Sequence, residues 1–315
     1  MRLVVTGALG HIGSRLIREV PAALPGTELV LVDDLSTQRY CSLFELPDGS
    51  CYRFVEADVR TADLGSLFTN ADVVIHLAAI TNASASFEIR EQVEQVNLMG
   101  TERVARACAA AGTRLVFLST TSVYGSQEAV VDETSALADL RPQSPYAESK
   151  LRAEQVLQDL GESDGLDYVV CRFATIFGTS IGMRFHTAIN KFCWQSTMGL
   201  PLTVWRTALE QQRPYLDLGD ATRALVHIVK MNLFDRNIYN VVTVNATVAD
   251  ILEIIRRHVP DVQVEFVDSP IMNQLSYAVS NGKFAARGFH PMGNLEAGIV
   301  ETLRLIVAAG GGHAR

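Results

Sequence analysis

A glycine-rich turn directly after the first apolar run constrains the fold of this chain more than any other feature. Residues 2–6 read as a short buried strand, and they lead into residues 6–13 (TGALGHIG), which carry the pattern GxxGxxG. Glycine permits a tight strand-to-helix turn and close approach of the backbone to a pyrophosphate, and the helix that follows presents free N–H groups to the phosphates. The residues expected there are Gly7, Gly10, His11, Ile12 and Gly13. Because glycine-rich turns are common, the prediction of a dinucleotide site depends on what surrounds this turn.

An acidic side chain stands where the adenosine ribose of a dinucleotide would lie. Asp33 ends a second apolar run at 29–32 and comes 20 residues after Gly13, a position from which a carboxylate accepts hydrogen bonds from the ribose hydroxyls. Its charge would repel a 2′-phosphate, and no Arg or Lys follows before Arg39, so NAD is favoured over NADP. Further candidates for the adenosine end are Asp34, Asp58 and Val59. An Asp at the end of a strand also serves as an ordinary turn residue, so both interpretations stay open for Asp58.

Apolar runs of strand length alternate with helical patterns through the first half of the chain. The expected strands are 2–6, 29–32, 72–77 and 114–119, and the expected helices are 11–20 (closed by Pro21), 91–111 (followed by Gly112 as a left-handed cap), 146–160, 221–231 and 247–258. Continuous apolar strands separated by helices imply a parallel sheet covered on both faces. We therefore predict an α/β fold with a Rossmann-type doubly wound parallel sheet.

The regular alternation ends near residue 175, and longer segments punctuated by Gly and Pro follow. We interpret residues 1–175 as an NAD-binding Rossmann domain to which a later segment, about 214–245, returns. Residues 176–310 would form mainly a smaller, interleaved substrate-binding lobe. A flexible tail is expected at 311–315, because its glycines do not repay their ordering entropy.

A tyrosine and a lysine lie one helical turn apart in the segment 145–150 (PYAESK), where Ser144 and Pro145 form a plausible helix start. Tyr146 and Lys150, at positions i and i+4, point from the same face of a helix. A phenol is a poor base at its ordinary pKa near 10. A nearby cation, together with a positively charged nicotinamide, would stabilise the phenolate. A pKa decrease of roughly 3 units requires about 4 kcal/mol of differential stabilisation.

With both patterns in place, the sequence resembles the extended short-chain dehydrogenase/reductase family, in particular its NAD-dependent nucleotide-sugar epimerase/dehydratase branch. The resemblance covers nearly the whole chain. The segments that carry it are TGALGHIG (6–13), VDDLS (32–36), ADVR (57–60), HLAA (76–79), NLMGT (97–101), STTSVYG (119–125), PYAESK (145–150), RFATIFG (172–178) and RPYLDLGD (213–220).

The resemblance implies roles for individual residues. NAD is the implied cofactor, with Asp33 and Asp58 at its adenosine and Lys150 at its nicotinamide ribose. Leu77, Ala78 and Ala79 would line the cofactor, and Asn97 would brace the helix around it. Thr120, Tyr146 and Lys150 would form the catalytic group. A homodimer is also expected, packed through the helices at about 91–111 and 146–160.

The residues after the catalytic hydroxyl distinguish the reactions of this branch. The 4,6-dehydratases carry Asp and Glu there, whereas this chain has Thr121 and Ser122. A hydroxyl near its ordinary pKa cannot perform the acid–base steps of dehydration at neutral pH. The chain is therefore expected to be an isomerase, a nucleotide-sugar 4-epimerase. Tyr146 would accept the C4 hydroxyl proton while hydride passes to NAD, and the rotated 4-keto sugar would receive the hydride on its other face. A dehydratase or reductase of the same family is the alternative, and an NAD-sensing regulator is the non-enzyme alternative.

A nucleotide-diphosphate sugar is the expected substrate. Arg213 is the main candidate for its diphosphate, because a guanidinium binds phosphate oxygens bidentately. An ion pair between Arg213 and Asp217 or Asp220 is the structural alternative. Arg184 and His186 make an acidic sugar conceivable, and Trp194 and Trp205 are candidates either for stacking on the base or for the core. The expected substrate contacts are Thr121, Ser122, Thr175, Asn190 and Arg213, with Arg184 as a further candidate.

Composition excludes several other classes of function. The chain has 27 Lys and Arg against 35 Asp and Glu, a net charge of −8, which does not suit a nucleic-acid binder. The five cysteines form no CxxC pair and the seven histidines form no HExxH pattern, so neither disulfides nor a metal site are expected. No leader and no apolar run long enough for a membrane span is recognised, and a cytoplasmic location is expected.

Overall fold

The centre of the molecule is a sheet of seven strands in which every pairing is parallel. The computed structural model describes residues 1–125, 129–268 and 276–310. The strands, in their order across the sheet, are β11 (Ile238–Val241), β7 (Tyr168–Phe173), β5 (Arg114–Thr120), β4 (Val73–His76), β1 (Arg2–Thr6), β2 (Glu28–Asp33) and β3 (Cys51–Glu56). The order reverses between β1 and β4, so the carboxyl ends of these two strands mark the ligand-binding crevice of such a sheet.

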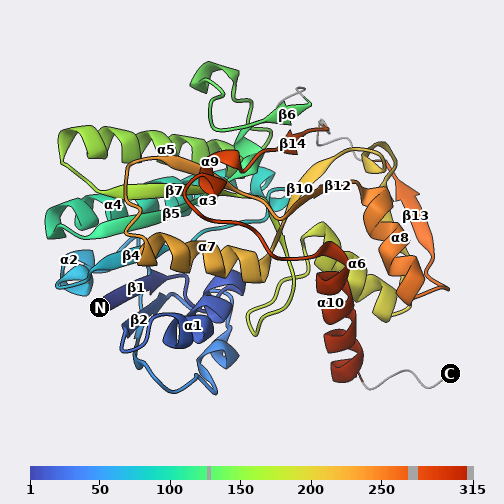
Figure 1. Cartoon of the computed structure of the whole chain (residues 1–315), viewed down its shortest axis with the longest axis horizontal. Coiled ribbons are helices and arrows are strands. Elements are labelled where there is room, and N and C mark those ends of the chain that lie inside the picture. Colours follow the sequence, from blue (N-terminus) through green and yellow to red (C-terminus); the bar gives the residue numbers. More distant parts are fainter. Residues whose placement is uncertain (126–128, 269–275, 311–315) are drawn as a thin grey trace.

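Helices cover both faces of this sheet (Figure 1), which confirms the predicted Rossmann-type α/β fold. Successive side chains of β1 point to opposite faces: Leu3 and Val5 belong to one apolar cluster and Val4 to another. The helices on the face of Leu3 are α1 (His11–Ala23) and α7 (Leu218–Lys230), and those on the face of Val4 are α2 (Leu64–Phe68), α4 (Gly100–Ala111) and α5 (Pro145–Ser163). Burial of both faces explains why these strands are continuous apolar runs in the sequence.

The expected end of the first helix at Pro21 is wrong, because α1 continues to Ala23. Pro21 lies in the last turn, where it removes one backbone N–H donor and leaves the carbonyl of Ile17 without its usual helical partner. The hydroxyl of Tyr52 lies 3.4 Å from this carbonyl and donates at 2.9 Å to the carbonyl of Pro47.

The expected helix at 91–111 is one helical run that contains an irregularity. It consists of α3 (Arg90–Val93), a π-helical segment (Glu94–Met99) and α4, and it ends at Gly112, whose φ of +64° confirms the predicted left-handed cap. The start of α5 is also as predicted, since the Ser144 hydroxyl accepts a hydrogen bond from the amide of Ala147 at 3.2 Å.

The second half of the chain builds a smaller lobe around its own apolar cluster. Its strands are β8 (Thr175–Phe177), β10 (Arg213–Asp217), β12 (Val244–Ala246), β9 (Leu202–Trp205) and β13 (Val264–Val267), and its helices are α6 (Ala188–Thr197), α8 (Val248–His258) and α10 (Leu295–Gly310). Strand β10 pairs with β8 and β12, so the segment that returns to the large sheet begins after β10, with α7 and β11.

A second return follows near residue 278. Strand β14 (Ala278–Val279) pairs with β6 (Val130–Val131), and α9 (Gly282–Ala285) packs against β11. The expected tail at 311–315 lies outside the described residues. Within the described ranges, no helix is long and apolar enough to cross a membrane. In the same ranges, no group of three or more His, Cys, Asp or Glu side chains is placed to hold a metal ion, and all five cysteines are free.

Candidate active site

A cleft of about 890 Å³ lies at the crevice marked by the reversal of strand order. The glycine turn between β1 and α1 forms part of its wall. Gly7 has φ +66°, and a Cβ built on it would lie 2.6 Å from the amide nitrogen of Ala78 in the segment after β4. A Cβ on Gly13 would lie 2.5 Å from the carbonyl oxygen of Gly7. Only glycine fits at these two positions, and no side chain caps the N-terminus of α1, so its first amides are available to an anion.

His11 provides an independent test of whether this turn fits a dinucleotide. Its ring is 3% exposed and its Nδ1 lies 2.8 Å from Ser180 Oγ. Burial, reinforced by the positive charge of Arg184, lowers the pKa of His11 to about 3, so the ring is neutral. Its Nε2 is buried without a hydrogen-bond partner among the described residues. An unpartnered polar atom beside free helix amides fits a phosphate oxygen of NAD.

The acidic residues predicted for the adenosine end are gathered at that end of the cleft. Asp33 accepts hydrogen bonds from the amides of Leu9 at 3.0 Å and Leu35 at 3.1 Å, which fixes its carboxylate against the glycine turn. Burial raises the pKa of Asp33, and these two bonds oppose that rise. The remaining lone pairs of its oxygens can accept from ribose hydroxyls. Asp34, Asp58 and Val59 also line the cleft.

Thr120, Tyr146 and Lys150 meet in the middle of the cleft. Thr120 is the last residue of β5, and its hydroxyl is hydrogen-bonded to that of Tyr146 in the first turn of α5. Burial raises the pKa of Tyr146, and the charge of Arg184 and the bond to Thr120 oppose that rise. The lowered tyrosine pKa expected from the sequence is therefore not produced by the protein alone. It requires the positive nicotinamide as well.

Lys150 is only 3% exposed, and its Nζ lies 4.7 Å from the centre of the Phe117 ring. Burial lowers the pKa of Lys150 to about 7, and the charge of Glu154 opposes this decrease. The lysine therefore gives up its proton more readily than an exposed lysine does. A cation over an aromatic face is held in place as well as stabilised.

A loop of the smaller lobe packs directly on the glycine turn and carries Arg184 into the cleft. The amide of Gly182 donates to Ser14 Oγ at 2.9 Å, and a Cβ on Gly182 would lie 2.4 Å from the carbonyl oxygen of Leu9. Arg184 donates to the Thr81 hydroxyl, and its Nε is buried without a hydrogen-bond partner among the described residues. His186 lines the same part of the cleft.

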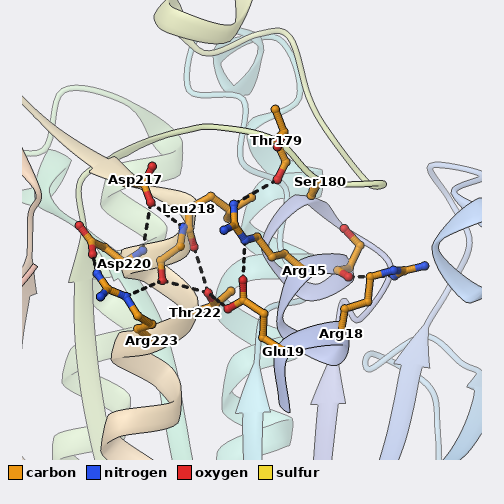
Figure 2. A network of polar contacts seen from close by, with 12 residues as sticks. Arg15, Arg18, Glu19, Thr179, Ser180, Asp217, Leu218, Asp220, Thr222 and Arg223 are labelled. Atoms are coloured by element: carbon orange, nitrogen blue, oxygen red, sulfur yellow. Dashed lines mark hydrogen bonds and ion pairs between the residues drawn. The ribbon is translucent and has the colours of Figure 1, made fainter. Parts of the chain in front are cut away.

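Of the residues predicted to contact substrate, Thr121, Ser122, Thr175 and Arg213 line the cleft. Arg213 lies over the ring of Tyr277, with 5.3 Å between the guanidinium carbon and the ring centre. Neither alternative ion-pair partner holds it. Asp217 caps α7 through the amides of Gly219 and Asp220, and Asp220 pairs with Arg223 (Figure 2).

Three of the candidate residues, Asn97, Asn190 and Trp194, lie outside the lining of the cleft. Asn97 does not line the cleft: it holds the backbone of Ile80 through two hydrogen bonds, of 2.8 and 2.9 Å. Asn190 is fully buried and bonds to the backbone of Gly178 and Arg184, so it supports the Arg184 loop rather than a ligand. Trp194 packs on Phe185 outside the cleft lining. Trp205, by contrast, lines the cleft.

The structure also adds residues to the cleft that were not predicted as site residues. Arg39 reaches the cleft, and its Nη1 lies 4.0 Å from the position of a Cβ on Gly10. Lys191 lines the substrate end and donates to the Thr203 hydroxyl at 2.6 Å. Tyr277 comes from a segment about 60 residues further along the chain than Arg213. A basic residue just after the predicted ribose-binding acid was the available signal for Arg39. Neither Lys191 nor Tyr277 stands in a recognisable pattern.

Together, the parallel sheet, the glycine turn and the paired Tyr146 and Lys150 define a dinucleotide-binding protein of the short-chain dehydrogenase/reductase type. The chain belongs to the NAD dependent epimerase/dehydratase family, whose model matches residues 3–241. NAD is accordingly its cofactor.

Curated relatives include both epimerases and dehydratases. The chain is 29% identical over 237 residues to an uncharacterized UDP-glucose epimerase of Bacillus subtilis, which covers 73% of this chain and 72% of that protein. It is 27% identical over 321 residues to a trifunctional UDP-glucose 4,6-dehydratase/UDP-4-keto-6-deoxy-D-glucose 3,5-epimerase/UDP-4-keto-L-rhamnose-reductase of Arabidopsis thaliana. That match covers 96% of this chain and 46% of the relative, so the chain spans about half the length of that enzyme.

Solved structures resemble the chain over nearly its whole length. MoeE5 in complex with UDP-glucuronic acid and NAD superposes with a TM-score of 0.85 at 25% identity, covering 98% of this chain and 100% of that one. The dTDP-glucose 4,6-dehydratase DesIV of Streptomyces venezuelae has a TM-score of 0.88 at 24% identity, covering 99% and 98%. The second likeness shows the fold alone. The comparisons therefore establish the family, and the reaction has to be argued from the residues of the cleft.

Proposed function

We propose that this protein is an NAD-dependent nucleotide-sugar 4-epimerase, and the distribution of acidic side chains in the cleft carries this proposal. Among the described residues of the lining, the acids are Asp33, Asp34 and Asp58, all at the adenosine end. Thr121 and Ser122 follow the catalytic threonine. Elimination of water requires one group to remove a proton from carbon and another to protonate the leaving hydroxyl. Hydroxyl side chains supply neither at neutral pH, so this cleft supports reversible oxidation at one carbon.

The residues around Tyr146 fit that chemistry. When bound, NAD supplies the hydride acceptor and donor. Tyr146, as phenolate, accepts the proton of the C4 hydroxyl and returns it after the sugar has turned. Thr120 is proposed to share hydrogen bonds with the C4 oxygen and with Tyr146. Lys150, one turn further along α5, is proposed to stabilise the phenolate. Arg184 adds a second cation near the tyrosine and lowers the energy of its charged form.

A nucleotide-diphosphate sugar is the proposed substrate because its charge and size fit the lobe side of the cleft. Arg213 and Thr175 are proposed to hold the diphosphate, and Trp205 supplies an aromatic surface for the base. A tightly held diphosphate leaves the hexose able to turn, as epimerisation demands. The homodimer and the cytoplasmic location stay predictions, and sedimentation of the pure protein tests the dimer.

The test is a panel of sugar nucleotides incubated with the NAD-loaded protein. It includes UDP- and dTDP-linked glucose, the matching glucuronic acid and the N-acetylated sugar. We expect a product of unchanged mass with inverted C4, identified by mass spectrometry and NMR. A product that has lost water, or consumption of NADH, would replace the epimerase with a dehydratase or reductase. If the protein binds NAD but converts no sugar nucleotide of the panel, the NAD-sensing regulator becomes the favoured alternative.

A further inference from the structure

A carboxylate is buried one helical turn beyond the catalytic lysine, and the proposed reaction does not use it. Glu154 on α5 is 6% exposed. Its oxygens accept hydrogen bonds from Arg172 on β7, at 3.0 Å from Nε and 2.7 Å from a terminal nitrogen. The hydroxyl of Ser119 on β5 donates to the same carboxylate. Glu154 therefore ties α5 to two neighbouring strands of the sheet.

These bonds place the two reactive side chains of α5 relative to β5. Ser119 comes immediately before Thr120, so α5 is joined to the end of β5 at two points, through Glu154 and through Tyr146. Lys150 lies between these points, over Phe117 of the same strand. A shift of α5 along β5 would move the lysine and the tyrosine together.

The partner of Glu154 is itself held firmly. The Arg172 guanidinium lies 4.9 Å from the centre of the Tyr124 ring, and the Tyr124 hydroxyl donates to Asn240 of β11 at 2.9 Å. Although burial alone would lower the pKa of Arg172, its bonds with Glu154 raise it above its usual value, so the cation persists. A buried ion pair stabilises a fold little compared with apolar side chains of equal volume. Fold stability alone therefore does not account for this pair.

The neighbours that the structure records for Lys150 from other elements are neutral. From β4 comes His76, whose pKa burial lowers to about 3, so it is uncharged at neutral pH. Phe117 of β5 is apolar. Arg172 of β7 is paired with Glu154, and Arg184 of the lobe acts on Tyr146. Glu154 is the negative charge whose influence on the lysine opposes its burial.

We propose that Glu154 is a positioning residue for Lys150: it ties α5, which carries both the lysine and Tyr146, to β5 and β7, and its negative charge stabilises the ammonium group of the lysine. The inference rests on the proposed function only through the role of Lys150 at the nicotinamide ribose. It is therefore tested by cofactor binding, which is separate from turnover. Failure of every sugar nucleotide to react would overturn the epimerase and leave this inference standing.

The experiment measures the pH dependence of NAD affinity, by calorimetry on protein freed of cofactor, in the parent and in Glu154→Gln. The amide keeps the size of the side chain and its hydrogen-bonding oxygen but removes the charge. Without that charge Lys150 deprotonates at lower pH, so the loss of affinity with rising pH begins earlier. We expect a shift of roughly one pH unit to lower pH, which is about tenfold in affinity on the falling limb.

Because Glu154→Gln leaves the Arg172 cation buried without its partner, a second variant secures the test if the first does not fold. The double variant Glu154→Gln/Arg172→Met removes a cation together with the carboxylate, so a downward shift smaller than that of Glu154→Gln is expected. A pH curve of folded Glu154→Gln that coincides with the parent, or an upward shift in the double variant, would overturn the proposal. So would a uniform loss of affinity without any shift, because that is what a merely structural residue produces.

Glu148→Gln is the matched control. Glu148 is a carboxylate of the same helix that pairs with Arg90 at 2.9 Å on the surface. Removing Glu148 changes the charge of α5 by the same amount as removing Glu154, but solvent screens the charge of Glu148. We expect the pH dependence of NAD affinity in Glu148→Gln to coincide with that of the parent. A shift equal to that of Glu154→Gln would show that any charge on the helix acts alike, and would overturn the role given to Glu154.

Discussion

The Oγ of Ser180 lies 2.8 Å from Nδ1 of His11, which joins the smaller lobe directly to the cofactor turn. Ser180 belongs to the loop that carries Arg184 beside Tyr146, and the same loop bonds to Ser14 through the amide of Gly182. The loop that brings a cation to the reacting phenol is therefore in direct contact with the cofactor turn. From these contacts we expect cofactor binding and assembly of the sugar site to be coupled.

Ser180→Ala is expected to weaken NAD binding about fivefold. The variant removes the partner of His11 Nδ1 and leaves a buried ring nitrogen unsatisfied, which costs about 1 kcal/mol. Without this bond, the loop that carries Ser180 and Arg184 has to become ordered when NAD binds, which further weakens binding. Calorimetric titration of the cofactor-free protein measures the affinity. Ser163→Ala is the control, since the Ser163 hydroxyl bonds only to its exposed neighbour Asp164 among the described contacts. Equal affinities of parent and Ser180→Ala would show that the lobes are not coupled here.

Tyr146→Phe is expected to reduce turnover by about 10²- to 10⁴-fold while NAD remains bound. The substitution removes the hydroxyl that accepts the substrate proton, and the ring keeps its place in the first turn of α5. Steady-state rates on the best sugar nucleotide measure the first effect, and the cofactor content of the purified variant measures the second. Turnover at the parent rate would remove Tyr146 from the mechanism.

The elements that bind cofactor were predictable because each has a local cause in the sequence. The glycine turn, the acid at the end of β2 and the Tyr146–Lys150 spacing depend on backbone geometry within a few residues of each other. The helix cap at Gly112 is equally local, and its positive φ follows from the end of α4. Such features need no knowledge of what packs against them.

The polar residues that support the site could not be predicted in the same way. Asn97 and Asn190 are polar residues in motif-like segments, and the sequence suggested a bracing role beside the cofactor for Asn97 and a substrate contact for Asn190. In the structure their amides satisfy the backbone of Ile80 and of Gly178 and Arg184 instead. Which polar group bonds to a ligand and which bonds to a distant carbonyl depends on tertiary packing.

Arg213→Gln is expected to raise the dissociation constant of the nucleotide sugar roughly 10- to 100-fold, the loss of a charge-assisted hydrogen bond worth about 1.5–3 kcal/mol. NAD affinity should stay at the parent value, because Arg213 stands on β10 of the lobe. Binding of the product or of UDP to the NAD-loaded protein gives the measurement. Arg206→Gln is the control, since Arg206 stacks on Phe266 outside the cleft lining. An unchanged dissociation constant in Arg213→Gln would show that the diphosphate does not bind at Arg213.

His76 should make the fold sensitive to acid. It is 1% exposed, with Nδ1 2.7 Å from the Thr6 hydroxyl and Nε2 3.1 Å from that of Thr101. Burial lowers its folded-state pKa to about 3, against about 6.5 in an unfolded chain. The unfolded state therefore binds one more proton between these two values. The free energy of unfolding consequently falls as the pH falls through that window, by about 1.4 kcal/mol per pH unit for this one group.

Urea unfolding at pH 6.5, 6 and 5 (about the upper part of that window) tests this expectation, with His76→Gln against the parent. Other groups titrate in the same range, so the informative quantity is the difference between the two slopes. The variant lacks the titrating ring. Its free energy of unfolding should therefore fall less steeply with falling pH than that of the parent, and the two slopes should differ by the uptake of one proton. His290→Asn removes an exposed histidine and should keep the parent slope. Equal slopes for the parent and His76→Gln would mean that the ring takes up its proton without unfolding, so that Thr6 and Thr101 tolerate an imidazolium between them.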